Sequence, residues 1–140
     1  MDKNKLGQEV FAMVSVPTGI TSERIIDLIC CAFEGGINYW AMVKSKKKPK
    51  IKCPYKTTVM HESWEGYSYW YPLVDGGSIQ LVNDEGEKCL PLNKETINKG
   101  LIIMANKYPW HFDNFIKENE DAETADVFIQ CCVFGEIVFG

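Results

Sequence analysis

The segment Ala122–Phe134 constrains the fold more than any other part of this chain. From Val127 onward its residues are apolar on nearly every side of a helix, and Gln130 is the only polar interruption. A helix that is apolar all round is buried in the interior of its domain. Asp121 suits the N-cap position before this segment, and Gly135 suits the position that ends it. We therefore expect a deeply buried helix here, with the rest of the chain arranged around it.

The remaining hydrophobic pattern predicts a single α+β domain over residues 1–140, with a mixed or mostly antiparallel sheet and about three helices packed on one face of it. Two further helices are expected, from Thr21 or Ser22 to about Phe33 and over Lys94–Asn106. Lys107–Glu120 is expected to be irregular or a short helical turn. Alternating or β-branched residues predict strands over Gln8–Val16, Ile37–Val43, Lys56–Met60, Tyr67–Val74, Ser78–Val82, Lys88–Leu90 and Ile137–Phe139. Of these, Gln8–Val16 should lie inside the sheet, and Asp75-Gly76-Gly77 should turn one strand into the next.

Charge is distributed unevenly along the chain. The net charge of −4 argues against general nucleic-acid binding, which needs a positive surface to neutralise phosphates. The lysines nevertheless gather in one run, while residues 113–136 hold seven acids and a single base. The members of the run are Lys44, Lys46, Lys47, Lys48, Lys50 and Lys52. These clusters fit a solvated loop and a solvated acidic face, or else docking between copies of the chain or a basic lip over an anionic ligand.

The cysteines are expected to be reduced. Four of the six stand in adjacent pairs inside apolar helical patterns, and adjacent residues rarely form a mutual disulfide. No signal peptide or membrane-spanning stretch is predicted, so we expect a cytoplasmic protein with no membrane partner. A zinc site built from Cys53, Cys89, His61 and His111 is an alternative, but these residues lack the usual ligand spacing. No cofactor is expected.

Two short patches carry more polar detail than a core requires. The first is Glu34-Gly35-Gly36-Ile37-Asn38-Tyr39-Trp40, in which the two glycines allow a left-handed turn and a close approach of the backbone to another group. The second is Asp121–Gln130. A buried Gln130 needs hydrogen-bond partners, and the backbone near Gly35 and Gly36 or the side chain of Asn38 would join the two patches. The alternative is a helix end followed by core aromatics, with ordinary capping by the acids.

The candidate ligand-binding residues come from these patches, from two aromatic clusters and from the lysine run. They are Glu34, Gly36, Asn38, Tyr39, Trp40, Trp70, Trp110, Lys48, Asp121 and Gln130. Aromatic rings stack on nucleobases, carboxylates and carboxamides bind base edges or ribose, and lysine neutralises phosphate. The sequence contains no motif that pairs a catalytic nucleophile with a general base, so we expect a protein that is not an enzyme. A small hydrolase or metal enzyme built on Glu34, Asp121, Glu123 and His111 is the weaker alternative.

The first patch, the Gly76-Gly77 turn, Gly100 in a helix and the ending from Asp121 through Phe134-Gly135-Glu136 together resemble small uncharacterised proteins of tailed bacteriophages and prophages. The resemblance implies a genomic context and transfers no activity or catalytic residue. By analogy with small phage accessory proteins, it implies a role against host defence. Our leading hypothesis is a homo-oligomer that sequesters a small anionic, nucleotide-like immune signal. The alternative is a protein–protein inhibitor of a host defence complex, such as an anti-CRISPR.

Overall fold

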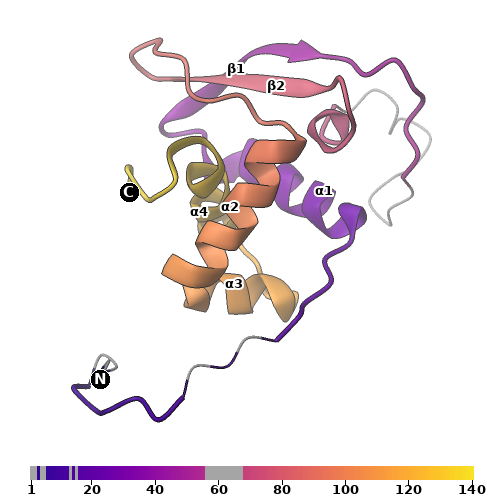
Figure 1. Cartoon of the computed structure of the whole chain (residues 1–140). Coiled ribbons are helices and arrows are strands. Elements are labelled where there is room, and N and C mark those ends of the chain that lie inside the picture. The colour runs from indigo at the N-terminus through magenta and orange to yellow at the C-terminus, as the bar shows by residue number, and fades with distance from the viewer. Residues whose placement is uncertain (1–2, 4–5, 13, 15, 56–67) are drawn as a thin grey trace.

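The computed structural model describes residues 3, 6–12, 14, 16–55 and 68–140, and this part of the chain has the α+β class expected from the sequence. Four α-helices accompany a two-stranded antiparallel sheet among these residues, one helix more than expected. Figure 1 shows the sheet at one end of the molecule and the helices gathered on one side of it. In chain order the elements are α1 (Ser22–Cys31), the π-helix η1 (Ala32–Gly36), β1 (Ala41–Lys47), the 3₁₀ helix η3 (Tyr71–Leu73), β2 (Ser78–Asn83), α2 (Lys94–Lys107), α3 (Pro109–Ile116) and α4 (Ala122–Phe134).

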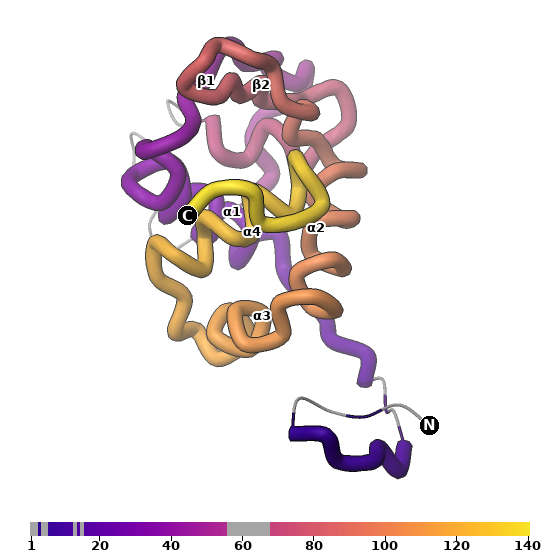
Figure 2. Tube along the Cα trace, turned by 90° about the vertical axis from the view of Figure 1, so that its left-hand side faces the viewer, coloured from indigo at the N-terminus to yellow at the C-terminus, as the bar shows by residue number. Residues whose placement is uncertain are grey.

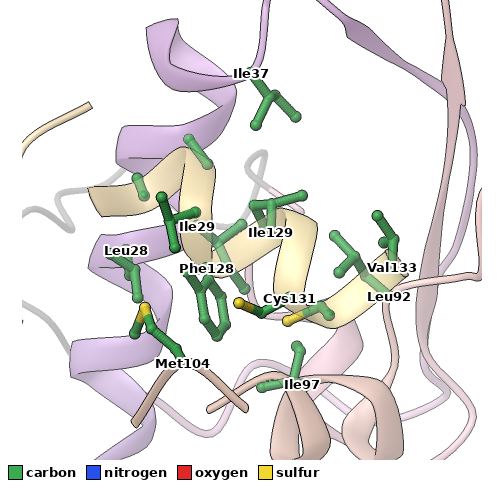
Figure 3. Close-up of a cluster of buried hydrophobic side chains, with 14 of the residues drawn as sticks. Leu28, Ile29, Ile37, Leu92, Ile97, Met104, Phe128, Ile129, Cys131 and Val133 are labelled. Carbon is green, nitrogen blue, oxygen red and sulfur yellow. The ribbon is translucent and has the colours of Figure 1, made fainter. Parts of the chain in front are cut away.

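Helix α4 is the centre of the fold, as its all-round apolar composition predicts. Every residue from Thr124 to Val133 is buried, and α4 contacts α1, η1, α2 and α3. Phe128 and Ile129 lie between apolar side chains of α1 and α2 in Figure 3. The core extends to Ile79 and Leu81 of β2, so the sheet covers one end of this helical cluster.

The helix termini follow the signals in the sequence. The side chains of Thr21 and Asp121 accept hydrogen bonds from backbone N–H groups in the first turns of α1 and α4. Asn93 and Thr96 form a reciprocal capping box at the start of α2. Gly135 has a φ of 78°, the left-handed conformation that ends α4 as expected. These local hydrogen bonds explain why the boundaries of the three helices were predictable.

The sheet is smaller than expected. β1 pairs with β2 in antiparallel register from Ala41 opposite Asn83 to Lys47 opposite Ser78, with an irregularity between Val43 and Ser45. The expected strand Ile37–Val43 is therefore displaced, because Ile37–Trp40 forms a turn and the strand continues into the lysine run. The Asn83–Gly86 turn then brings Lys88 back to an isolated bridge with Val82, in place of the expected short strand.

Several other predicted strands are wrong. In Tyr67–Val74 the described residues form a turn and η3, because Pro72 lacks the N–H that a strand would donate. The Asp75–Gly77 turn thus joins η3, and not a strand, to β2. Ile137–Phe139 is an irregular tail. The stretch after α2, which we expected to be irregular or a short helical turn, contains a regular helix, α3. The expected strand Lys56–Met60 lies outside the described residues.

The segment Gln8–Val16 is also not the interior strand that its alternation predicts. Met13 and Ser15 lie outside the described residues, and the others belong to no strand; Glu9 makes only an isolated bridge with Lys3. Phe11, Val14 and Val16 are exposed. Figures 1 and 2 both show the described residues of this segment extending away from the helices, at the end of the molecule opposite the sheet.

Candidate functional site

The two polar patches meet around one cleft beside α4. This cleft, here called the α4 cleft, has a volume of about 410 Å³. Residues of η1 and the following turn, of α3, of α4 and of the C-terminal tail line it: Gly35, Gly36, Tyr39, His111, Ala122, Glu123, Asp126, Val127, Gln130, Ile137, Phe139 and Gly140. Three of the candidate ligand-binding residues, Gly36, Tyr39 and Gln130, are therefore brought together from positions far apart in the sequence.

Asp126 is the polar centre of this region. Its Oδ1 accepts hydrogen bonds from Trp40 Nε1 at 2.7 Å and from Gln130 Nε2 at 2.9 Å, and its Oδ2 accepts one from Tyr39 Oη at 2.5 Å. The carboxylate is almost completely buried. A buried carboxylate needs such donors, since burying it without them would cost several kcal/mol. Asp126 thus joins the turn before β1 to α4, a role that sequence reasoning assigned to Gln130.

Gln130 has partners other than the expected ones. Its Oε1 accepts hydrogen bonds from the backbone N–H groups of Val138 and Phe139 at 2.7 and 2.8 Å, and its Nε2 donates to Phe139 O at 3.1 Å. The predicted contact with Asn38 or the Gly35-Gly36 backbone is wrong, because the C-terminal tail takes up these hydrogen-bonding groups. Gln130 therefore holds the tail that forms one wall of the α4 cleft.

The aromatic residues of the first patch divide into a buried one and an exposed one. Trp40 is fully buried and stacks on Phe139 with ring centroids 5.1 Å apart and planes inclined by 10°. Its ring is therefore unavailable to a ligand. Tyr39 is 54% exposed and lines the cleft. Burial of its hydroxyl, and then its hydrogen bond to Asp126, raise the pKa of Tyr39 to about 12. Its hydroxyl consequently stays protonated and acts as a donor at neutral pH.

Gly36 brings η1 against the start of α4. A Cβ at this position would lie 2.6 Å from the backbone oxygen of Ala122 and 3.4 Å from the backbone nitrogen of Asp126. The close approach expected from the double glycine is therefore an approach to α4. The left-handed turn expected there is wrong, because Gly35 has a φ of 172° and no positive φ occurs at Gly36.

His111 and Asp121 are engaged with α4. His111 Nδ1 lies 3.1 Å from Thr124 Oγ1, and Thr124 is fully buried, so its hydroxyl is not accessible to a ligand. Asp121 Oδ1 accepts from Thr124 N at 2.9 Å, which is the ordinary capping alternative. Trp110 is exposed and packs edge-on against His111. Among the lining residues, Glu123 is the exposed carboxylate that a ligand could reach.

A second hollow, here called the lysine pocket, has a volume of about 160 Å³. It is lined by Lys48, Pro49, Lys50, Ile51, Lys52, Cys53 and Trp70. Two more candidate residues, Lys48 and Trp70, thus belong to one site, but it shares no lining residue with the α4 cleft. Trp70 is buried, and its Nε1 has no hydrogen-bond partner among the described residues. The base-stacking face expected of Trp70 is therefore not exposed.

The last candidates lie outside both hollows. Glu34 and Asn38 are exposed, and Glu34 Oε1 accepts a hydrogen bond from Tyr69 Oη at 3.4 Å. Trp110 and Asp121 are not among the lining residues of either hollow. The structure therefore divides the predicted ligand site into an acidic cleft with one exposed tyrosine and a separate basic pocket.

Burial raises the pKa of five of the six cysteine thiols. All six are thiols and none forms a disulfide. Burial raises the pKa of Cys30 to about 12 and that of Cys131 to about 11, so both stay protonated at neutral pH. Within the described residues, no three His, Cys, Asp or Glu side chains are grouped closely enough to hold a metal ion. His61, one member of the alternative zinc set, lies outside those residues.

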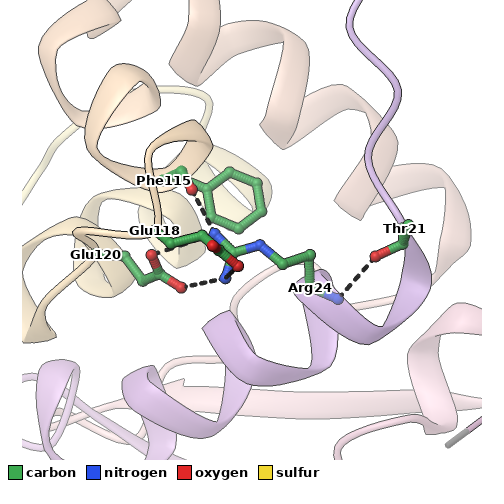
Figure 4. A network of polar contacts seen from close by, with 5 residues as sticks. All are labelled: Thr21, Arg24, Phe115, Glu118 and Glu120. Atoms are coloured by element: carbon green, nitrogen blue, oxygen red, sulfur yellow. Dashed lines mark hydrogen bonds and ion pairs between the residues drawn. The ribbon is translucent and has the colours of Figure 1, made fainter. Parts of the chain in front are cut away.

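Sequence reasoning missed one polar network, which is drawn in Figure 4. Arg24, the single arginine of the chain, donates to Glu120 Oε1 at 2.6 Å and Oε2 at 3.2 Å and to the carbonyl oxygen of Phe115. Its guanidinium also lies 4.8 Å from the centre of the Phe115 ring. Arg24 thereby ties α1 to the connection between α3 and α4. The partners are more than ninety residues apart in the chain, so no local pattern indicates them.

Comparison with protein-family models, with curated proteins and with solved structures finds no match to this chain. In the described part of the chain, no helix combines the length and the apolar composition needed to cross a bilayer.

Proposed function

We propose that this protein binds a small anionic, nucleotide-like ligand without transforming it, and that the lysine pocket receives the anionic group. The observation that carries the proposal is the arrangement of Lys48, Lys50 and Lys52 around one hollow. Several ammonium groups around a concave surface raise the local concentration of anions. Trp70, whose buried Nε1 has no hydrogen-bond partner among the described residues, forms part of the wall of the same hollow.

The size of the lysine pocket limits what it would hold. Its 160 Å³ is below the roughly 300–1,000 Å³ of pockets that enclose a drug-sized ligand. It is about five times the roughly 30 Å³ that one water occupies in the liquid, which suits a phosphate group. The rest of a nucleotide would then extend over the neighbouring surface, which limits the buried area and the affinity.

The α4 cleft is large enough for a nucleoside but has the wrong charge for its phosphate. Glu123 and the buried Asp126 would repel a phosphate, and the exposed carboxylate of Glu123 would accept hydrogen bonds from ribose hydroxyls or exocyclic amines. The exposed face of Tyr39 would stack on a base. We therefore assign the anionic group to the lysine pocket and treat the α4 cleft as the place for a neutral, donor-rich group.

The biological role that we propose is the one implied by the resemblance to phage accessory proteins. A ligand binder without catalysis would act by sequestering a nucleotide-like host immune signal in the host cytoplasm. Sequestration requires a high concentration of sites, and a homo-oligomer would supply several sites in each particle.

The test is native mass spectrometry of the full chain, alone and with cyclic nucleotides, ADP-ribose-derived nucleotides and inorganic phosphate. We expect a discrete adduct, and a rise in melting temperature with ligand concentration because binding only to the folded state stabilises it. The double variant Lys48→Ala/Lys50→Ala should lose the adduct. Lys44→Ala/Lys46→Ala is the matched control, since it removes the same charge from exposed positions on β1. No adduct in the panel, or equal losses in both variants, would refute the proposal.

A protein–protein inhibitor is the second candidate, and one observation favours it. Trp110 is 64% exposed on α3, and exposed tryptophans are frequent hot spots of protein interfaces. The acidic side chains of Asp113 and Glu118 on the same stretch are also exposed, as mimicry of nucleic acid would require. If the ligand panel gives no adduct, capture of host proteins by wild type but not by Trp110→Ala would support this function.

A further inference from the structure

The segment Val10–Val16, here called the arm, has the composition of a strand without having the structure of one. It reads Val-Phe-Ala-Met-Val-Ser-Val and contains no charged residue, glycine or proline. Its described residues form no strand, Phe11 is fully exposed and Val14 is 80% exposed. A short, uncharged segment of high β propensity is prone to pair with any available strand edge. The arm therefore needs a partner that the described part of its own chain does not provide.

One strand edge in the described part of the chain is open. β1 is paired there with β2 alone, whereas the other side of β2 makes bridges with Lys88 and Leu92. Residues 42–47 of β1 are exposed, including Met42 and Val43. A two-stranded sheet is only marginally stable, and a third strand would bury part of this surface. β1 is thus an acceptor edge for a strand.

The arm does not lie beside the β1 edge of its own chain. It enters α1 through Pro17–Thr21, and Figures 1 and 2 both show it leaving the molecule at the end opposite the sheet. Donor and acceptor are therefore at opposite ends of one copy. Pairing between them is geometrically simple only when they belong to two copies.

We propose that the arm of one copy adds to the open edge of β1 in a second copy as a third strand. The two segments have the same length, because β1 also has seven residues. Main-chain hydrogen bonds supply the affinity in strand addition of this kind. The open backbone groups of the edge would become paired. Phe11 and Val14 are three positions apart and would point to opposite faces of the added strand, so main-chain pairing, and not burial of both side chains, carries the contact.

Charge favours the arm over the other available partner, a second β1. Lys44, Lys46 and Lys47 would be brought close to the same lysines of the second copy if two β1 edges met, and like charges across a strand pair destabilise it. Lysines on an edge strand guard against such pairing. The arm brings no charge and avoids this repulsion. The lysines of β1 thereby select the arm of another copy.

The contact is heterologous, since it joins different surfaces of two copies. Such a contact propagates until it closes on itself, as a reciprocal pair or a ring. This interface between copies does not depend on the ligand proposed above. It would be the contact that holds the proposed homo-oligomer together, so oligomerisation and ligand binding should respond to different substitutions.

The experiment uses the full chain at several concentrations. Native mass spectrometry or light scattering after size exclusion should give masses at multiples of 15.9 kDa. Hydrogen exchange at high concentration should show protection of the amides of Val10–Val16 and β1 together, and dilution should release both. Val14→Lys should abolish the oligomer, because it would set a new positive charge beside the lysines of β1. Leu90→Lys is the matched control, because Leu90 is another largely exposed apolar residue (58%) and lies outside the arm and β1.

Three outcomes would overturn the proposal. A monomer at every concentration would mean that no second copy accepts the arm. An oligomer that survives Val14→Lys would mean that another surface joins the copies. Protection of the arm that persists in the monomer on dilution would mean that the arm finds its partner within its own chain. Loss of the oligomer in Val14→Lys but not in Leu90→Lys, with unchanged melting temperature, would support the proposal.

Discussion

Replacing Asp126 with alanine tests whether the polar centre beside α4 stabilises the fold. The substitution removes the acceptor of three hydrogen bonds. Trp40 Nε1 would be left buried without a partner, while Gln130 Nε2 keeps its bond to Phe139 O and Tyr39, a half-exposed residue, can turn its hydroxyl to water. One orphaned buried donor costs about 1–3 kcal/mol, and a charge-assisted bond contributes about 1.5–3 kcal/mol. Partial relief from burying the carboxylate offsets some of this loss, so we expect Asp126→Ala to lose about 3 kcal/mol.

The assay is equilibrium unfolding in urea, followed by tryptophan fluorescence. With a slope of about 1–3 kcal/mol per molar urea, a loss of about 3 kcal/mol lowers the midpoint by about 1–3 M. Asp126→Asn keeps an oxygen for Trp40 and Gln130 and should lose less, about 1 kcal/mol. Glu123→Ala is the control on the same helix, where loss of an exposed first-turn acid costs up to about 1 kcal/mol.

One result would refute the reasoning. If Asp126→Ala unfolds within about 0.5 kcal/mol of Glu123→Ala, the buried network contributes no free energy and the carboxylate has another purpose. If Asp126 binds a ligand instead, Asp126→Asn should keep the stability of the wild type and lose ligand binding. The two measurements on the same pair of variants therefore separate a structural carboxylate from a ligand-binding one.

Three further predictions concern other parts of the fold. Gly100→Ala should lower the free energy of unfolding by about 1–3 kcal/mol or more, because the new Cβ would lie 2.3 Å from Cys132 Sγ. The control is Gly19→Ala, whose Cβ would have nothing within 4 Å and which should unfold in urea nearly as the wild type does. Arg24→Met should cost about 3–5 kcal/mol by leaving a largely buried carboxylate unpaired, against less than about 1 kcal/mol for Lys117→Ala at an exposed ion pair. Tyr39 has a pKa raised to about 12, so its contribution to stability is complete below the usual value of 10.0 and is lost as the pH rises through 12. In ultraviolet titration, the difference between wild type and Tyr39→Phe should be a tyrosine that ionises near pH 12, whereas a difference centred near pH 10 would contradict the structure.

The parts of the fold that the sequence predicts are those fixed by local chemistry. Asp121 and Asn93 cap their helices through side-chain bonds to backbone groups three residues away, and such bonds can be recognised from spacing alone. The burial of α4 follows from its composition. In contrast, the bond between Tyr39 and Asp126 spans eighty-seven positions and depends on how η1 packs on α4. The sequence pointed to the two patches but not to the side chain that joins them.

The wrong strand predictions have a common physical origin. The aromatic alternation before Val74 is equally compatible with a strand and with a turn that packs rings on the core, and Pro72 decides for the turn. The first patch likewise carries aromatic residues typical of strands, yet Asp126 fixes Trp40 in a turn. Propensity describes what a segment fits, whereas tertiary partners determine what it forms.

The arm, Val10–Val16, is a further segment whose strand propensity is not matched by its structure. The strand pattern of Val10–Val16 is as strong as any in the chain, and the segment fails to form a strand where the described residues offer it no neighbour. Elsewhere a contact explains why a predicted strand does not form. In the expected strand Ile137–Phe139, for example, the backbone N–H groups of Val138 and Phe139 donate to Gln130 Oε1. Phe11 has no such contact and is fully exposed. A strand pattern that no contact among the described residues has replaced is the reason for the proposed pairing with the edge of β1 that those residues leave open.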